Sequence, residues 1–456
     1  MNYSEAIQFL YNLRLFGAKF GLENTFRLAA LAGNPQDRLR FIHVAGTNGK
    51  GSTCAMLESI YRAAGLRVGL FTSPHLVSFR ERIQVNRQLI PQAEVVRLVE
   101  ALQPLLKQFP ADHHPTFFEV ITVMALKYFA EQKCDLVIWE TGLGGRLDAT
   151  NIVTPLASVI TNIQFDHQQW LGDTLERIAT EKAGVIKPGV PVITTVEEPE
   201  ALAVIEKTAR EKNAPLIKVG QASRLQGAPE RPSGAAAASL SPSEETKKLE
   251  TGKMPVLPLP GAHQLINAAL ALVTVETLQN KISASDSAIR TGLETVQWPG
   301  RMQLIQKPGG QKILLDGAHN VAGAKALRSA LEKNFIAARQ TLILGVLQDK
   351  DWPHICKILA PTAARIFTVP VTSERTADAR KLAAACRTAN PAAKIAAGDS
   401  LRRALDQAAN DRFVVVTGSL YLVGEALELL GLSPATSEER ALNEWNVRPQ
   451  PIPAAG

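Results

Sequence analysis

The sequence predicts an α/β protein in which a doubly wound parallel sheet with a P-loop is followed by a smaller Rossmann-like α/β domain. Three observations carry this prediction. Short β-branched runs alternate with helical patterns along the chain. A glycine-rich loop joins an early strand to a helix. The alternation ends near Arg301 and then begins again, so we expect domains at 1–297 and 298–456, divided at the turn "QWPGRM".

The elements follow from apolar periodicity. The chain starts with an amphipathic helical pattern that places Ile7, Leu10, Leu13 and Phe16 on one face. The apolar runs predicted as buried parallel strands are 41–46, 67–73, 135–142, 156–162 and 190–195 in the first domain, and 312–320, 341–347, 365–371 and 412–419 in the second. The predicted helices of the first domain are 52–64, 93–108, 117–132 and 175–184. Segment 223–253, rich in Ala, Ser, Pro and charge, predicts an irregular insert, and the tail after about 432 is also expected to be irregular.

Composition limits the function classes. The 456 residues include 50 basic and 43 acidic side chains, and this net charge of +7 comes without a dense Lys/Arg run. With only 5% aromatic residues, we expect no nucleic-acid partner. No segment approaches the roughly 20 apolar residues of a membrane span, and the four cysteines follow no C-x-x-C spacing. These features predict a cytoplasmic protein, expected to be a monomer, without disulfides, zinc or a signal peptide.

The stretch "HVAGTNGKGST", 43–53, predicts a phosphate-binding loop of unusual pattern. The common motif G-x-x-x-x-G-K-[ST] places a hydroxyl directly after the lysine. Here Gly51 follows Lys50, and Val44 stands where the first glycine is expected. Strand, glycines, lysine, hydroxyls and helix still occur in the right order, which favours ATP binding over an ordinary tight turn. The predicted ATP-binding residues here are Gly46, Thr47, Asn48, Gly49, Lys50, Gly51, Ser52 and Thr53.

Oxygen and nitrogen donors follow other strands of the predicted first sheet. Glu140 ends one strand, Ser73 follows a second, and Asp166 and His167 follow a third. Ligands of parallel α/β sheets gather at the carboxyl edge of the strands. Each residue alone could be a cap or a turn residue. Together with the loop they predict a Mg²⁺ site beside a nucleotide.

A family resemblance rests on motifs in a fixed order. The stretches "VAGTNGKGST", "SPHL", "ETGLGGRLDATN", "DH-x-x-WLG", "EKAG", "LPGAHQLINAALAL", "WPGR" and "DGAHN" resemble the folylpolyglutamate synthase/dihydrofolate synthase family of the Mur ligase superfamily. The resemblance runs from the first helix to about Gly431 and leaves out the insert and the tail. The family's loop keeps a glycine between lysine and hydroxyl, which accounts for the unusual pattern.

The resemblance implies a catalytic set of Lys50, Glu140, His167 and Lys182. One Mg²⁺ is implied at Ser73 and Glu140, and a second at His167 with Glu140 shared. Lys182, in "EKAG", is similar to a lysine that the family carbamylates, which would make it an anionic metal ligand; the alternative is a plain or salt-bridged lysine. Imidazole is a softer ligand than Mg²⁺ usually takes, so we expect Mn²⁺ to be tolerated.

Further contacts are implied in both domains. Asn267, Arg301 and Asp316 resemble ATP-contacting residues, with a helix N-cap as the alternative for Asn267. Phe118, Leu147, Asp148 and Ala149 resemble the pterin region, whereas we expect Phe117 in the core. His319 and Ser419, together with Asn320, follow strands of the second domain and are candidates for contacting the incoming amino acid.

The implied activity is ATP-dependent amide formation. L-Glutamate would be added to dihydropteroate, to reduced folates such as tetrahydrofolate, or to both, through an acyl phosphate. Phe117 before Phe118-Glu119 resembles bifunctional bacterial members. The alternatives are a folylpolyglutamate synthase alone, another Mur-type ligase, a P-loop kinase or GTPase switch, and a non-catalytic binding protein. No guanine-reading N-K-x-D occurs in the chain, which argues against the switch.

Overall fold

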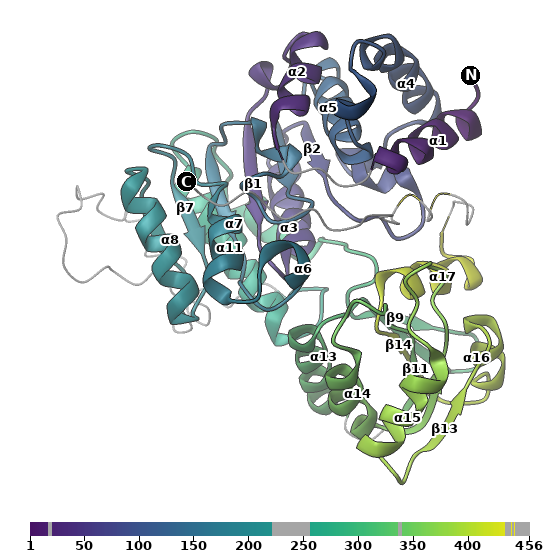
Figure 1. Cartoon of the computed structure of the whole chain (residues 1–456). Coiled ribbons are helices and arrows are strands. Elements are labelled where there is room, and N and C mark those ends of the chain that lie inside the picture. The colour runs from purple at the N-terminus through teal and green to yellow at the C-terminus, as the bar shows by residue number, and fades with distance from the viewer. Residues whose placement is uncertain (17–20, 221–255, 336–339, 434–438, 440–441, 443–456) are drawn as a thin grey trace.

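The first sheet has eight strands in the order β4-β3-β2-β5-β1-β6-β7-β8. Figure 1 labels β7, β1 and β2 of this sheet. The computed structural model describes residues 1–16, 21–220, 256–335, 340–433, 439 and 442, so the predicted insert lies outside the described residues. Six strands run parallel, and β3 and β4 form an antiparallel edge next to β2. The strands are β1 Phe41–Ala45, β2 Val68–Phe71, β3 Ile83–Val85, β4 Gln88–Leu89, β5 Leu136–Glu140, β6 Ala157–Ile160, β7 Val192–Thr194 and β8 Leu216–Lys218.

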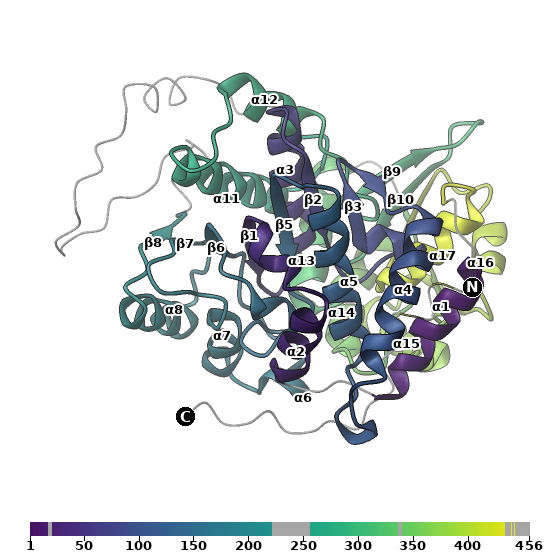
Figure 2. The same cartoon turned by 90° about the horizontal axis from the view of Figure 1, so that it is seen from above.

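Helices cover both faces of this sheet because its strands are buried on both sides. Alternate residues of β1 show the pattern: Phe41 packs into one apolar cluster, and Ile42 and Val44 pack into another. Figure 2 shows α11 and α12 on one side of the strands and α7 and α8 on the other. The helices are α1 Tyr3–Asn12, α2 Glu23–Leu31, α3 Lys50–Ala63, α4 Gln92–Leu106, α5 Phe117–Glu131, α6 Gln168–Leu171, α7 Leu175–Ala183, α8 Pro199–Glu211, α11 Ala262–Leu278 and α12 Asp286–Glu294.

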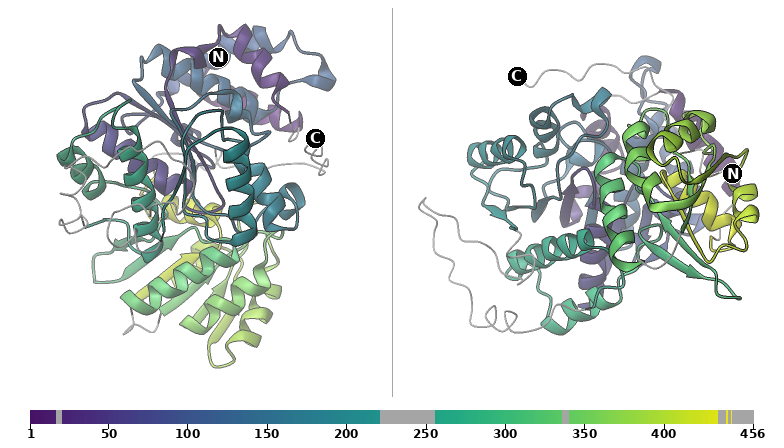
Figure 3. Two further views of the ribbon diagram at one scale, coloured as in Figure 1. Left: turned by 90° about the vertical axis from the view of Figure 1, so that its left-hand side faces the viewer. Right: turned by 90° about the horizontal axis from the view of Figure 1, so that it is seen from below.

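The second sheet has six strands in the order β13-β12-β11-β14-β10-β9. Five are parallel, and β9 is antiparallel to β10. Its strands are β9 Gln303–Gln306, β10 Lys312–Asp316, β11 Gln340–Leu344, β12 Ala363–Thr368, β13 Lys394–Ala397 and β14 Phe413–Thr417. Its helices are α13 Val321–Asn334, α14 Trp352–Leu359, α15 Ala379–Ala389, α16 Leu401–Gln407 and α17 Leu420–Leu429. Figure 3 shows this second unit packed below the first.

The fold confirms the predicted class and adds what the sequence pattern missed. Every strand predicted from an apolar run is present, but β3, β4, β8, β9 and β13 were not expected. These extra strands have two to four residues, and three of them pair antiparallel at a sheet edge, so they lack the long apolar run of a central strand. Helix α1 ends at Asn12, and a 3₁₀ turn at Leu13–Phe16 replaces the rest of the predicted helix.

The junction between the two sheets falls between α12 and β9. The domain boundary at residues 297–298 stays a prediction. The described tail residues, however, do not stay with the second sheet, because Leu442 packs into the apolar cluster that contains α1, α4 and α5. Within the described part of the chain, no helix combines the length and apolarity that crossing a membrane requires.

Candidate active site

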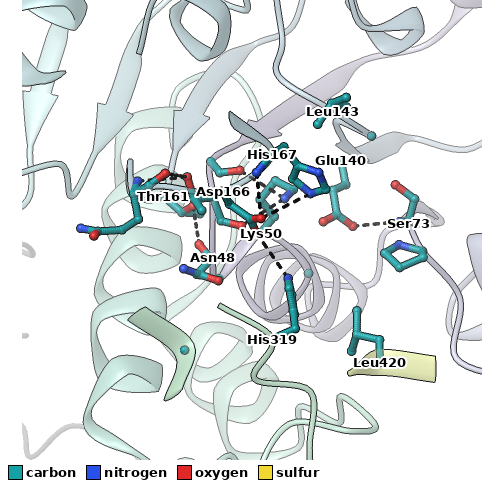
Figure 4. Close-up of a pocket in the computed structure, with 18 of the residues that line it drawn as sticks. Asn48, Lys50, Ser73, Glu140, Leu143, Thr161, Asp166, His167, His319 and Leu420 are labelled. Atoms are coloured by element: carbon teal, nitrogen blue, oxygen red, sulfur yellow. Dashed lines mark hydrogen bonds and ion pairs between the residues drawn. The ribbon is translucent and has the colours of Figure 1, made fainter. Parts of the chain in front are cut away.

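A cavity of about 580 Å³ is lined by both domains and holds most of the predicted site. The first sheet contributes the residues that leave its carboxyl edge, since Val44 pairs in register with Glu140 and with Val159. The second sheet contributes the turns that follow β10, β11 and β14. Figure 4 shows the labelled side chains Lys50, Ser73, Glu140, His167 and His319 gathered from the two units.

The glycine-rich loop forms a cradle at the N-terminus of α3. Gly49 is the N-cap with φ 85°, and a Cβ there would collide with Asn267. Gly46 has φ 144°, and a Cβ there would collide with Thr161. Only glycine fits these two positions, so backbone N–H groups can approach an anion closely.

The polar side chains of the loop divide between cavity and core. Ser52 lines the cavity, whereas Thr53 is fully buried and absent from the lining. The amide Nδ2 of Asn48 is buried without a hydrogen-bond partner among the described residues, which suits an anionic oxygen. The cradle therefore fits a nucleotide phosphate, and of the two hydroxyls only Ser52 is placed to face a bound ligand.

Two lysines meet behind this cradle. Lys50 Nζ donates to the carbonyl oxygen of Gly46 at 3.2 Å, and Lys182 Nζ donates to the same oxygen at 2.9 Å. Lys182 is 4% exposed. Burial, and then the charge of Lys50, lower the pKa of Lys182 to about 7. At neutral pH a large fraction of the Lys182 amine is therefore uncharged.

Glu140 lies at the end of β5, opposite these lysines, and is 3% exposed. Its Oε2 accepts a hydrogen bond from the backbone N–H of Ser73 at 3.1 Å. Burial raises the pKa of Glu140 to about 7, and the charges of Lys50, Arg301 and Arg82 oppose the rise. A further cation at this carboxylate would favour its ionised form.

His167 follows β6 and opens α6 with φ 52°. Burial and the charge of Lys350 lower its pKa, although 35% of the side chain remains accessible. The imidazole is therefore neutral at pH 7 and can offer a nitrogen lone pair.

The polar side chains of the cavity suit a metal ion whose remaining ligands are substrate phosphates and water. Among the described residues, no group of three or more His, Cys, Asp or Glu side chains is arranged to hold a metal ion. Mg²⁺ usually takes one or two protein carboxylates together with substrate phosphates and water. The hydroxyl of Ser73, which lines the cavity, and the carboxylate of Glu140 fit that use.

Asp166 connects the two domains, which the sequence did not reveal. Its Oδ1 accepts from Lys350 Nζ at 2.6 Å, and its Oδ2 accepts from Asn320 Nδ2 at 3.0 Å. The same Asn320 Nδ2 donates to Asn48 Oδ1 of the loop at 3.0 Å. A weak signal for Lys350 was its place in the segment that follows the predicted strand of β11.

The three ATP contacts implied by resemblance line the same cavity. Asn267 lies within α11 and not at its N-cap, which is Gly261, so the capping alternative is wrong. Asp316 accepts from the backbone N–H of Met302 at 2.9 Å and of Ala318 at 3.0 Å, which holds the "WPGR" turn against the end of β10. Arg301 lies on that turn.

The predicted pterin residues also line the cavity: Phe118, Leu147, Asp148 and Ala149. Phe118 packs so closely on Gly142 that a Cβ there would collide with its ring. The carboxylate of Asp148 accepts from the backbone N–H of Leu143 at 2.7 Å and of Thr150 at 3.0 Å, so it shapes its own loop. Phe117 is 8% exposed and packs into the core, as expected, but it also lines the cavity. Arg82, which the sequence did not single out, is a further cavity-lining cation.

The three candidates for the incoming amino acid follow strands of the second domain. His319 and Ser419 line the cavity, whereas Asn320 is not among the lining residues. His319 Nδ1 is 2.7 Å from the carbonyl oxygen of Gly317, and its Nε2 is 3.5 Å from Asp166 Oδ2. Ser419 is 1% exposed and caps α17 by accepting from the N–H of Tyr421 at 3.1 Å.

Known proteins are similar to this chain in architecture and sequence. The Mur ligase middle domain matches residues 44–275, and the Mur ligase, glutamate ligase domain matches residues 300–420. A dihydrofolate synthase/folylpolyglutamate synthase of Bacillus subtilis is 37% identical over 428 residues, covering 93% of this chain and 98% of the relative.

Solved structures agree with these matches. A crystal structure of folylpolyglutamate synthase from Thermotoga maritima is 33% identical, with a TM-score of 0.79, and the match covers 96% of this chain and 99% of that one. The structure of E. coli FolC in complex with DHPP and ADP is 31% identical, with a TM-score of 0.78 and coverage of 94% and 98%.

Proposed function

This chain belongs to the dihydrofolate synthase/folylpolyglutamate synthase family of Mur ligases, and we propose that it joins L-glutamate to a folate-type carboxylate at the expense of ATP. The observation that carries the proposal is the shared cavity. The phosphate cradle, Glu140 and the pterin-side residues around Phe118 line one space, which the second domain completes. A kinase or switch would not need the second domain's turns at the same cavity.

The reaction requires two anionic substrates and ATP to meet, although they repel one another in water. A carboxylate oxygen of the acceptor attacks the γ-phosphorus and ADP leaves, which forms an acyl phosphate. The free amine of glutamate then attacks the acyl carbon, loses a proton and expels phosphate. Lys50 and Arg301 offset charge on the transferring phosphoryl group, one from each domain. The closed cleft holds the reactants together and keeps water from the acyl phosphate.

We propose that Mg²⁺ is the partner of ATP here, held by Ser73 and Glu140, with His167 and a modified Lys182 at a second ion. The metal would neutralise phosphate charge. Glu140 is a buried carboxylate whose usual charge is disfavoured without a cation, which supports a cation beside it. Mn²⁺ is expected to substitute, because His167 is a softer ligand than oxygen.

Carbamylation of Lys182 is part of the proposal. The step joins the uncharged Nζ to the carbon of CO₂ and releases one proton, leaving a carbamate anion. The lowered pKa of Lys182 supports it, because only the neutral amine is a nucleophile. The carbamate would also relieve the repulsion between this nitrogen and Lys50.

We further propose that both dihydropteroate and tetrahydrofolate are accepted. The aromatic ring of Phe117 precedes Phe118 at the start of α5, as in the bifunctional members that the sequence resembles. Polyglutamylation of reduced folates alone is the second candidate.

The test is phosphate release from ATP by the purified protein, with dihydropteroate or tetrahydrofolate, each with and without glutamate. We expect release only when an acceptor and glutamate are both present. Turnover with neither acceptor would refute the proposal, and turnover with tetrahydrofolate alone would restrict it to polyglutamylation. Release without glutamate would indicate a hydrolase or a switch.

The place of action and the assembly state are proposals as well. Cys54, Cys134, Cys356 and Cys386 are all free and buried, which supports a reducing compartment such as the cytoplasm. We expect a monomer, and light scattering after size-exclusion chromatography tests this.

A further inference from the structure

Two described residues of the C-terminal tail lie on the first domain, although the chain reaches them from the second. Helix α17 of the second domain ends at Leu429. Beyond it, Leu442 is 1% exposed and packs into the apolar cluster of the first domain, and Glu439 is 5% exposed. The tail therefore links the two domains a second time, apart from the turn at 297–302.

The carboxylate of Glu439 is held by the first domain through three hydrogen bonds. Its Oε2 accepts from Ser78 Oγ at 2.8 Å, from the backbone N–H of Phe79 at 2.6 Å and from the hydroxyl of Tyr3 at 3.0 Å. All three donors are neutral. A buried carboxylate is costly unless it accepts such bonds, so these three donors stabilise the docked Glu439 side chain.

The backbone of Glu439 makes a fourth contact that leads toward the cavity. Its carbonyl oxygen accepts from His75 Nε2 at 2.9 Å. Because Nε2 carries the proton, Nδ1 of His75 is left as an acceptor, and Arg82 Nε donates to it at 2.8 Å. Burial lowers the pKa of His75 well below its usual value, in keeping with this neutral tautomer.

Arg82 is the cavity end of this chain of contacts. It is 3% exposed and lines the cavity, and its guanidinium carbon lies 5.6 Å from the centre of the Phe117 ring. Glu140 and the pterin-side residue Phe118 line the same cavity as Arg82. A guanidinium there suits the carboxylate of an acceptor substrate.

We propose that Glu439 is a positioning residue: the docked tail sets the hydrogen bonds of His75 and thereby aims Arg82 at the carboxylate of the acceptor substrate. This inference rests on the proposed function for the identity of that substrate. Glu439, which follows α17 of the second domain, would thus help to bind the acceptor substrate in the first domain.

The test compares Glu439→Ala and Glu439→Gln with Glu425→Ala. Glu425 is a matched control on α17, where its carboxylate accepts from Thr372 at 2.8 Å and makes an exposed contact within the second domain. For Glu439→Ala we expect the KM of the acceptor to rise about tenfold, the size of a lost hydrogen bond to a charged group. The KM values for ATP and glutamate and the kcat should stay within about twofold, because a positioning role acts on acceptor binding alone.

Glu439→Gln keeps the shape of the side chain and one acceptor oxygen, so it should fold and recover part of the loss. Arg82→Met should raise the same KM, and the double variant Arg82→Met/Glu439→Ala should add little, because the two residues act as one unit. The proposal is overturned if Glu439→Ala leaves the acceptor KM unchanged, or if it raises all three KM values equally.

Amide hydrogen exchange on the same proteins separates this inference from the proposed function. Protection of amides in 75–82 should fall in Glu439→Ala while protection in α3 stays unchanged. If wild type shows no acceptor-dependent turnover, the proposed function fails, and unchanged exchange in 75–82 would still overturn the positioning role by itself.

Discussion

Lys50 and Lys182 donate to one oxygen, the carbonyl of Gly46, at 3.2 and 2.9 Å. Two ammonium groups at one acceptor repel each other, and burial adds to the cost for Lys182. Lys50 keeps its ammonium for the phosphates in our proposal, and Lys182 gives up its positive charge. The pair thus places a cation from the loop and a proposed anion site from α7 at one carbonyl oxygen.

The first prediction concerns Lys182. We expect ¹³C-labelled CO₂ to give a carbamate carbon signal in the wild type and none in Lys182→Met, and we expect removal of CO₂ to lower activity reversibly. Lys187→Met is the matched control, because Lys187 is also partly buried and donates to the carbonyl oxygen of Asn151 at 3.0 Å. A signal that persists in Lys182→Met would place the modification elsewhere.

The second prediction concerns Lys50. Lys50→Ala should reduce kcat at least about a thousandfold, the usual cost of losing a group that stabilises transition-state charge. Circular dichroism and the thermal midpoint should remain close to wild type, because within the described part of the chain the Lys50 side chain donates only to two carbonyl oxygens of its own loop. A near-normal rate would mean that the phosphate site has been misplaced.

The third prediction concerns Glu140, whose replacement should increase stability at high pH and abolish activity. Its pKa is raised to about 7 in the folded state, so the fold binds a proton more tightly than the unfolded chain does. Stability from this group is present below about pH 4.5 and is lost as the pH rises through 7, by about 3 kcal/mol. Glu140→Gln should therefore be more stable than wild type at pH 8 without divalent metal, yet inactive. Urea unfolding at pH 5 and 8 tests this, and a lower midpoint for the variant at pH 8 would contradict it.

The fourth prediction concerns the link between the domains at Asn320. Its Oδ1 caps α13 by accepting from the N–H of Gly323 at 2.8 Å, and its Nδ2 reaches Asp166 and Asn48. Asn320→Ser keeps a capping oxygen but cannot reach the other domain. We expect kcat to fall about tenfold, because closure is impaired, while binding of a non-hydrolysable ATP analogue changes little.

A control variant at another helix N-cap separates an effect of capping from an effect of the contact between the domains. Ser285 caps α12 within the first domain, and Ser285→Asn should leave kcat unchanged. Equal losses of activity in both variants would show that capping, and not the contact between the domains, is responsible.

The fifth prediction concerns acid stability. His43 is fully buried in β1, its Nε2 lies 2.9 Å from Thr150 Oγ1, and burial lowers its pKa to about 3. The unfolded chain binds a proton near pH 6.5, so stability rises with pH between about 3 and 6.5. His43→Gln keeps an amide donor and does not titrate. Between pH 6.5 and 4 it should lose about 3 kcal/mol less stability than wild type in urea unfolding. Parallel losses in both proteins would contradict the assignment.

The sequence determined the parts of the site that follow from local pattern. The strand before Gly46 and the strand ending at Glu140 are apolar runs, and parallel strands end at a common edge, so the loop, Ser73, Glu140 and His167 could be placed together without coordinates. The sequence pattern was less reliable where one residue type fits two structural roles. Asn267 could have been an N-cap by residue type, but α11 begins earlier, after Pro260-Gly261.

Only the tertiary structure decided how the second domain and the tail complete the site. The ion pair of Asp166 with Lys350 joins residues 184 positions apart, and the bond of Glu439 to Phe79 joins residues 360 apart. The hydrophobic pattern of the sequence cannot predict such contacts, because they depend on the packing of one domain against another and not on the conformation of either segment. Local pattern thus placed the residues of the proposed phosphate and metal sites, and long-range packing placed the residues that join the two domains beside the cavity.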